Sequence, residues 1–264
     1  MSFVPATAAS FDALDNDVDD EIFTQYRPVI LKGLVKNWEI TRAGEESSEA
    51  LIQYMARFYT GYPLEIWIGP ADIDGRFFYS DDMQGFNFER KKAQLPSALN
   101  YLFSQNSKSR PQAVYMGATS IAQCLPGMET NNQLDVVPAG VSPNIWMGNQ
   151  VKISGHYDTS NNIACNVYGR RRFTLFPPEQ ISNLYVGPID LTPAGQAISM
   201  VDINNPDLER FPRYKSAMKS AVVVDLEPGD ALYIPPLWWH HVESLDAFNI
   251  LINYWWNTST LKTG

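Results

Sequence analysis

The sequence contains three histidines, and all of them lie in two short segments. His156 stands in the segment SGHYD, and His240 and His241 stand in the segment WWHH. Side chains alternate between the two faces of a β-strand, so His156 and Asp158 would point the same way and offer one nitrogen and one oxygen ligand. Two histidines and one carboxylate form the facial triad of non-haem Fe(II) oxygenases, which leaves metal positions open for other ligands. The pattern therefore predicts a metal centre of His156, Asp158 and one further histidine.

The third ligand is left open by the pattern itself. His240 and His241 are adjacent, and adjacent strand residues face opposite ways, so only one of them can join the other two ligands. A histidine two residues before an aspartate is a weak signal alone, and a hydrogen-bonded strand histidine would explain it equally well. The second segment, 84 positions later (240 − 156), and the strands expected around both segments make the combination specific.

The elements that must position these residues are mostly short strands. Beyond Ala113, apolar segments alternate with glycine and proline turns, which is typical of a double-stranded β-helix of the jelly-roll or cupin type, a mainly β fold. His240 is expected to follow the strand over 231–234. The expected strands are 113–116, 144–147, 151–157, 163–168, 171–176, 221–226, 231–234, 241–244 and 248–255.

The first part of the chain is expected to be mixed α and β. Residues 28–35 and 64–68 have the apolar character of strands, whereas 47–59 has helical spacing and Leu95 opens another helix. With 264 residues and 45% apolar content, the chain is long enough for one large core. We expect a single domain over 1–264, in which 1–110 supports a β-helix core over 111–257 that carries an insert near 188–220.

Charge and cysteine content restrict the partners and the compartment. The formal net charge is −9, which argues against nonspecific binding to nucleic acid or to an anionic membrane surface. No apolar run approaches a membrane span, and there is no signal pattern at the start. The two cysteines, Cys124 and Cys165, form no CxxC motif, so a reducing cytoplasm is expected, and the sequence leaves one disulfide open.

Several ordered motifs give the chain a family resemblance. Residues 151–256 carry, in order, HYD, GRRRFTLFPP, NPDLERFP, PGDALYIP, WWHHVES and NYW, and an earlier stretch reads YRPVILKGL. Together they resemble the JmjC-type 2-oxoglutarate oxygenases of the cupin-like group, and among these the protein asparaginyl hydroxylases. The resemblance implies the cofactor Fe(II), the cosubstrates 2-oxoglutarate and O₂, and the catalytic metal ligands His156, Asp158 and His240.

The resemblance also implies a set of cosubstrate contacts. The lysine with which the family holds the 2-oxoglutarate carboxylate is replaced here by Arg171, whose guanidinium can bind a carboxylate through two parallel hydrogen bonds. Arg170 and Arg172 should then face outward. Further contacts implied by the family are Tyr115, Asn162, Asn253 and Trp255, and Trp239 is expected in the pocket wall.

One family contact is missing from the sequence. The family has a hydroxyl three residues before the first ligand, where this chain has Ile153. Ser154 is adjacent but should point to the other face unless a β-bulge intervenes.

The activity implied by the resemblance is hydroxylation of protein or peptide side chains, with a small-molecule substrate left open. Two alternatives remain: a non-catalytic metal-binding cupin scaffold, and a cupin enzyme that does not use 2-oxoglutarate. The asparaginyl hydroxylases carry C-terminal helices that form their dimer. Because this sequence stops soon after its last expected strand, we do not expect that dimer, and other oligomers stay open.

Overall fold

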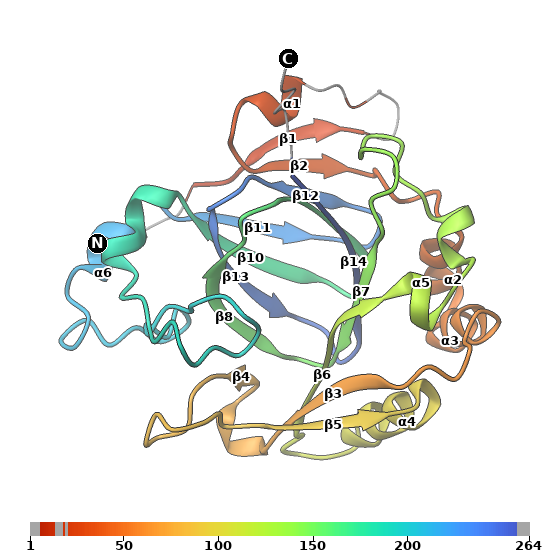
Figure 1. The fold of residues 1–264 in the computed structure, drawn as a ribbon, viewed down its shortest axis with the longest axis horizontal. Helices are drawn as coiled ribbons and strands as arrows, with labels where there is room; N and C mark the ends of the chain where they lie inside the picture. Colours follow the sequence, from red (N-terminus) through yellow and green to blue (C-terminus); the bar gives the residue numbers. More distant parts are fainter. Residues whose placement is uncertain (1–5, 14–17, 19–20, 258–264) are drawn as a thin grey trace.

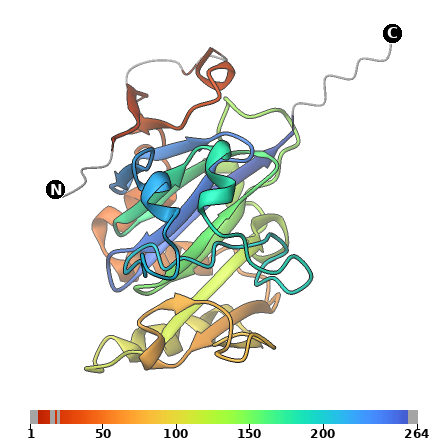
Figure 2. The ribbon, with the colours of Figure 1, turned by 90° about the vertical axis from the view of Figure 1, so that its left-hand side faces the viewer.

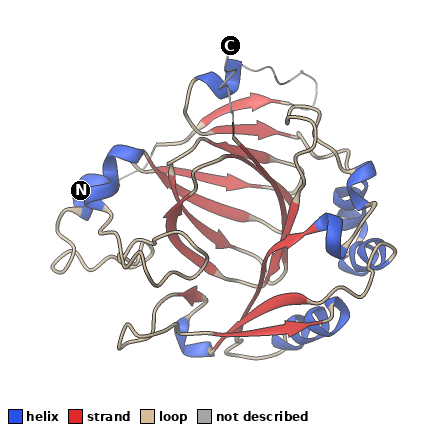
Figure 3. Cartoon of the chain, in the orientation of Figure 1, coloured by secondary structure: helices blue, strands red, loops and turns tan. Residues whose placement is uncertain are grey.

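The fold is built around two β-sheets that curve toward each other into a barrel (Figure 1, Figure 3). The computed structural model describes residues 6–13, 18 and 21–257. The larger sheet has nine strands in the order β1-β2-β12-β9-β14-β7-β6-β3-β5. These strands are β1 (Ala9–Asp12), β2 (Val29–Lys32), β12 (Ala231–Ile234), β9 (Asn161–Tyr168), β14 (Asn249–Trp256), β7 (Asn144–Gly148), β6 (Ala113–Ser120), β3 (Leu64–Gly69) and β5 (Glu89–Ala93).

The smaller sheet carries both segments that contain histidine. Its order is β11-β10-β13-β8-β4, and all neighbours are antiparallel except β4, which pairs parallel with β8. Because β8 and β13 are direct neighbours, residues far apart in the sequence lie side by side. The strands are β11 (Val222–Leu226), β10 (Arg171–Phe176), β13 (Trp239–Ser244), β8 (Lys152–Tyr157) and β4 (Arg76–Phe77).

Helices cover the outside of the barrel and leave its interior to the strands. Most of them lie along the larger sheet, while α6 (Tyr214–Met218) lies beside the smaller one, as the two orthogonal views show (Figure 1, Figure 2). The others are α1 (Glu21–Thr24), α2 (Glu39–Glu46), α3 (Ser48–Ala56), α4 (Leu95–Gln105), α5 (Ile121–Cys124) and the 3₁₀ turns η1 (Ala71–Ile73), η2 (Met128–Asn131) and η3 (Pro178–Asn183).

Apolar packing between the sheets closes one part of the barrel. Phe173, Leu175 and Val224 of the smaller sheet pack against residues of the larger sheet such as Leu232 and Leu251, all at most 5% exposed. A separate aromatic cluster around Trp67 and Phe77 packs where β3, β4 and β6 meet. The strands between these two clusters frame the functional site.

The structure confirms the mainly β jelly-roll fold and corrects several element boundaries. β13 begins at Trp239 and includes His240, whereas the strand expected from the sequence begins only at residue 241. The sequence analysis also did not predict β5 or α2. β5 has the sequence ERKKA on a sheet edge, without apolar alternation, and α2 has the sequence EITRAGEE, in which Ile40 and Ala43 are too few apolar residues to mark a helix.

Both cysteines are free and buried, which answers the open question of a disulfide. Across the described part of the chain, none of the helices combines the length and the apolar character that crossing a membrane would require.

Candidate metal centre and cosubstrate pocket

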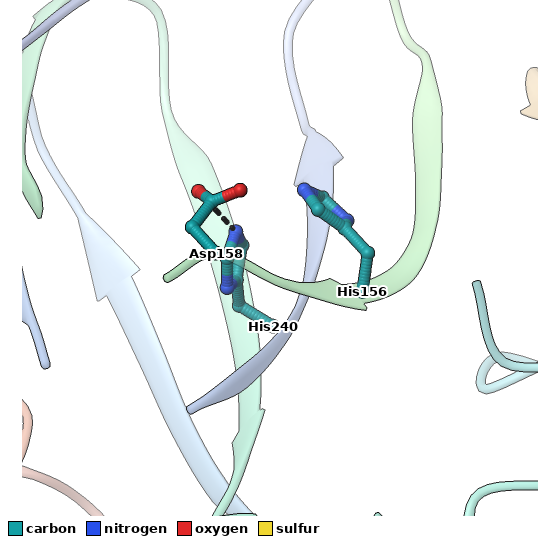
Figure 4. Close-up of side chains that lie close together, drawn as sticks. All are labelled: His156, Asp158 and His240. Atoms are coloured by element: carbon teal, nitrogen blue, oxygen red, sulfur yellow. Dashed lines mark ion pairs between the residues drawn. The ribbon is translucent and has the colours of Figure 1, made fainter. Parts of the chain in front are cut away.

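The predicted metal ligands converge from two neighbouring strands (Figure 4). His156 on β8 lies directly opposite His240 on β13, and Asp158 follows the end of β8. One ligand atom from each residue can be chosen so that all lie within 4.8 Å of one another. The Nε2 atom of His240 is 3.7 Å from Oδ2 of Asp158, and the two imidazole ring centres are 4.3 Å apart. Two nitrogens and one oxygen therefore face a common point.

Both ligand histidines are oriented by their own strands. Nδ1 of His156 lies 2.9 Å from the carbonyl oxygen of Ser154, and Nδ1 of His240 lies 3.1 Å from that of Trp238. A carbonyl only accepts, so each Nδ1 carries the proton and donates it, which leaves each Nε2 with a free lone pair. This arrangement fixes the tautomer and the ring orientation that a metal ligand needs.

The burial of His240 favours the form that binds metal. Its side chain is 5% exposed. Burial, together with the neighbouring His156, lowers the pKa of His240 to about 4, although Asp158 opposes the shift. At neutral pH the imidazole is therefore uncharged, which is the state in which histidine coordinates a metal.

The remaining histidine points away from the ligands, as strand alternation requires. Nε2 of His241 lies 2.9 Å from Oδ1 of Asn204, in the insert that covers the outer face of β13. The structure thus groups His240 with the other two ligands and separates His241 from them, a choice that the pattern alone had left open.

A β-bulge in β8 resolves the question of Ile153 and Ser154. His240 pairs with His156 and Val242 pairs with Ile153. Over this interval β8 therefore contains one residue more than β13, which is the bulge. Ile153 therefore lines the same cavity as His156 although it is three positions away. Ser154 lines the cavity as well, but its hydroxyl is already used, because its Oγ donates to the carbonyl oxygen of Phe77 at 2.9 Å.

The triad opens into a cavity of about 490 Å³ between the two sheets. Arg171 reaches this cavity from the first position of β10. The turn before it depends on Gly169, whose φ is +70°, and a Cβ there would lie 2.4 Å from the carbonyl oxygen of Phe248. The glycine thus lets β9 turn tightly into β10 and delivers Arg171 to the cavity.

Arg171 is a buried cation with free hydrogen-bonding capacity. It is 3% exposed, and among the described residues neither its Nε nor its Nη2 finds a partner. Burial lowers its pKa to about 10, so the guanidinium remains charged at neutral pH. Buried donors in native proteins are almost always paired. The two donors therefore indicate an anionic ligand that is absent from the chain itself.

Tyr115 is a titratable residue that interacts electrostatically with Arg171. It comes from β6, lines the cavity and is 6% exposed. Burial raises the pKa of its hydroxyl, and the charge of Arg171 partly offsets the rise. The hydroxyl is therefore protonated at neutral pH and can donate to the same anion as the guanidinium.

Asn162, Asn253 and Trp255 also line the cavity. Nε1 of Trp146 donates to Oδ1 of Asn253 at 2.7 Å, and Nδ2 of Asn253 donates to Oδ1 of Asn162 at 3.2 Å. This chain of bonds fixes both amides on neighbouring strands. Nε1 of Trp255 is buried and, within the described chain, has no partner. It is thus a further donor available to a ligand.

Three other expectations concern residues next to the site. Arg170 and Arg172 face outward as expected and form exposed ion pairs with Asp246 and Asp225. The expectation that Trp239 walls the pocket is wrong. Because it precedes His240 on β13, its side chain lies on the opposite face, where it contacts Tyr157.

One residue of the site, Gln196, was not predicted from the sequence, and its side chain contacts Asp158. Nε2 of Gln196 donates to Oδ1 of Asp158 at 2.8 Å. Gln196 lies in an irregular segment between η3 and α6, where no periodicity or motif marks a position. Glu65, Trp67 and Phe77 were also missed as cavity residues, because no recognised motif covers their elements.

The donor set fits Fe(II). Two imidazole nitrogens and one carboxylate oxygen on one side of a metal are the ligands of non-haem Fe(II) oxygenases, and they leave further coordination positions free. The nearby unpaired guanidinium fits the second carboxylate of a dicarboxylic keto acid such as 2-oxoglutarate.

Comparisons with known proteins agree with this geometry. Residues 15–262 match the model of the family described as the cupin-like domain, so the chain belongs to that family. JmjC domain-containing protein D of Dictyostelium discoideum is 26% identical over 258 residues, which cover 89% of this chain and 53% of that protein. The family and the names of the relatives are consistent with a JmjC-type cupin oxygenase.

Two further relatives match a shorter part of the chain. Lysine-specific demethylase JMJ31 of Arabidopsis thaliana is 36% identical over 124 residues, 46% of this chain and 22% of that protein. HSPB1-associated protein 1 of Homo sapiens is 37% identical over 118 residues, 44% of this chain and 24% of that protein. The chain thus spans from about a quarter to about half the length of these curated relatives.

Proposed function

We propose that the protein is an Fe(II)- and 2-oxoglutarate-dependent oxygenase that hydroxylates side chains of a protein or peptide. His156, Asp158 and His240 would hold the metal, and Arg171 would hold the far carboxylate of 2-oxoglutarate. Tyr115, Asn162, Asn253 and Trp255 would complete the cosubstrate pocket.

The observation that carries the proposal is the unpaired guanidinium of Arg171 in the cavity that the triad shares. A metal-binding scaffold has no need for a buried cation beside the metal, and a buried charge without a partner costs free energy. A ligand that bears both a metal-chelating group and a distant carboxylate uses both features of the cavity at once.

The contributions of the chain to the reaction follow from its contacts. Bound Fe(II) would supply the redox chemistry that activates O₂ and couples decarboxylation of 2-oxoglutarate to C–H hydroxylation, with succinate and CO₂ as the other products. The Nδ1 donors hold both imidazoles in orientation, and Arg171 would bind the far carboxylate of the keto acid. The aromatic walls, among them Trp67 and Trp146, limit the access of water.

The proposed substrate class is inferred from similarity to known proteins and not from a contact with a substrate. One of the relatives above is named a lysine-specific demethylase, and the sequence motifs resemble those of protein asparaginyl hydroxylases. Demethylation of lysine begins with the same C–H hydroxylation, so it is the second candidate for this chain. The net charge of −9 suits a basic peptide better than an acidic one.

Succinate formation tests the activity directly. The purified protein should convert 2-oxoglutarate to succinate with Fe(II), ascorbate and O₂, faster when a substrate peptide is present. Mass spectrometry of a peptide library then separates a gain of one oxygen from a loss of one methyl group. A protein that binds Fe(II) but yields no succinate above the rate of Asp158→Ala would contradict the proposal and favour a non-catalytic scaffold.

A further inference from the structure

The segment that contains Gln196 is tied to the metal-binding strand. The backbone N–H of Gly187 donates to the carbonyl oxygen of Ile198 at 2.8 Å, which closes residues 188–197 into a loop. Ile198 also forms a β-bridge with His156, and the N–H of Ser199 donates to the carbonyl oxygen of Gly155 at 2.6 Å. The base of the loop is therefore fixed beside a metal ligand.

The outer part of the same loop reaches the opposite side of the cavity. The hydroxyl of Tyr79 donates to the carbonyl oxygen of Leu191 at 2.8 Å, and the guanidinium of Arg90 on β5 donates to the carbonyl oxygen of Pro193. Pro193, Ala194 and Gln196 all line the cavity. The loop thus forms one wall of the cavity and connects β5 with the metal site.

Gln196 contacts one oxygen of Asp158 and leaves the other free. Its Nε2 donates to Oδ1 of Asp158 at 2.8 Å, while Oδ2 of Asp158 lies 3.7 Å from Nε2 of His240. An ionised carboxylate only accepts hydrogen bonds, so the amide nitrogen of Gln196 must be the group that faces it. The two oxygens of Asp158 therefore have different surroundings.

We propose that Gln196 is a positioning residue for the metal: its amide occupies Oδ1 of Asp158, so that the carboxylate offers Oδ2 alone to the ion. Asp158 then takes one coordination position and not two, which keeps the others available to the cosubstrate and O₂. This inference rests on the proposed function, since it assumes that Asp158 is a metal ligand. It adds a residue that the family motifs do not include.

Metal binding, measured without turnover, tests this role. Co(II) serves as the probe, because it takes the ligand types of Fe(II), is stable in air and has visible absorption bands that respond to its coordination. Gln196→Met keeps the length of the side chain and removes the donor, and Gln196→Asn keeps the amide but is one methylene shorter. Gln84→Met makes the same substitution at an exposed position.

We expect both Gln196 variants to bind Co(II) about 10- to 100-fold more weakly than wild type, as is usual when a hydrogen-bond partner of a metal ligand is lost. Their visible spectra should change, because Oδ1 becomes free to coordinate. Gln84→Met should match wild type in both measurements. Thermal unfolding of the metal-free variants should stay within about 4 °C of wild type, since a single hydrogen bond is lost.

The outcomes separate this inference from the proposed function. If Gln196→Met and Gln196→Asn bind Co(II) with the affinity and spectrum of wild type, Gln196 is not a positioning residue, and the oxygenase proposal is unaffected. If wild type itself binds no Co(II), or binds it as well as Asp158→Ala does, both proposals fail.

Discussion

The cavity contains two polar groups of opposite character, the triad and Arg171. Around the triad, the protein provides the partners itself: each Nδ1 of the ligand histidines has a backbone carbonyl, and Oδ1 of Asp158 has the amide of Gln196. Arg171 is as well buried, yet Nε and Nη2 of its guanidinium are unpaired within the described chain. The triad is thus oriented by the protein itself, whereas two donors of Arg171 are available to a ligand.

The difference indicates which component each group recognises. A metal ion requires ligands in fixed orientation, and the hydrogen bonds to their remote atoms provide that orientation. An anionic cosubstrate must enter and leave, and any permanent acidic partner of Arg171 would compete with it. The unpaired guanidinium therefore costs the protein stability in exchange for binding, and substitutions can test each side of this contrast.

Loss of a triad ligand should have the largest effect. His156→Ala, Asp158→Ala and His240→Ala each remove one of three metal ligands, so succinate formation with Fe(II) should fall to background. His241→Gln is the matched control, because its side chain points away from the site, and it should retain Co(II) binding. Turnover like that of wild type in Asp158→Ala would contradict the assignment of the triad.

Loss of the Arg171 guanidinium should weaken the binding of 2-oxoglutarate and leave metal binding unchanged. Charge-assisted hydrogen bonds contribute about 1.5–3 kcal/mol, so Arg171→Ala should raise the KM for 2-oxoglutarate about 10- to 100-fold or more while Co(II) affinity stays unchanged. Arg172→Ala removes the neighbouring exposed arginine and should leave KM unaltered. An equal rise in KM in both variants would show that the effect is not specific to the cavity.

Removing the charge of Arg171 should increase the stability of the protein, although it weakens cosubstrate binding. Arg171→Met replaces a buried, unpaired charge by an apolar side chain of similar length, so the cosubstrate-free protein should become more stable by about 1–3 kcal/mol. Urea unfolding measures the change. Adding saturating 2-oxoglutarate to the Co(II)-loaded protein should then stabilise wild type further but not the variant. A clear loss of stability in Arg171→Met would mean that the guanidinium has partners within the chain.

The smallest expected effect concerns the tyrosine beside Arg171. Tyr115→Phe removes one hydroxyl that can donate to the cosubstrate, and a single hydrogen bond contributes about 0.5–1.5 kcal/mol. The KM for 2-oxoglutarate should therefore rise about 2- to 10-fold with no change in Co(II) affinity. An unchanged KM would assign Tyr115 to core packing alone.

Much of the fold could be predicted because its strands are short, apolar and separated by glycine and proline. The mainly β fold and the strand over 171–176 were predicted correctly, the latter to the residue. The polar edge strand β5 was not, because an edge strand can be held by one neighbour without an apolar pattern. His240 was placed outside β13 for a related reason, since the boundaries of an element depend on backbone pairing more than on composition.

The sequence alone determined which residues could form the site. The scarcity of histidine, the spacing of His156 and Asp158, and the ordered motifs around them limit the ligands to very few choices. Local spacing carries this information, because alternation along a strand is a property of the chain itself.

The tertiary structure decided how those residues work. It put His240 opposite His156, brought Ile153 into the cavity through a bulge, and placed Gln196 against Asp158. It also left Arg171 buried and, among the residues that the structure describes, without a hydrogen-bond partner for Nε and Nη2. None of these facts can be predicted from spacing, because each depends on the register between strands or on a loop that packs against residues distant in the sequence.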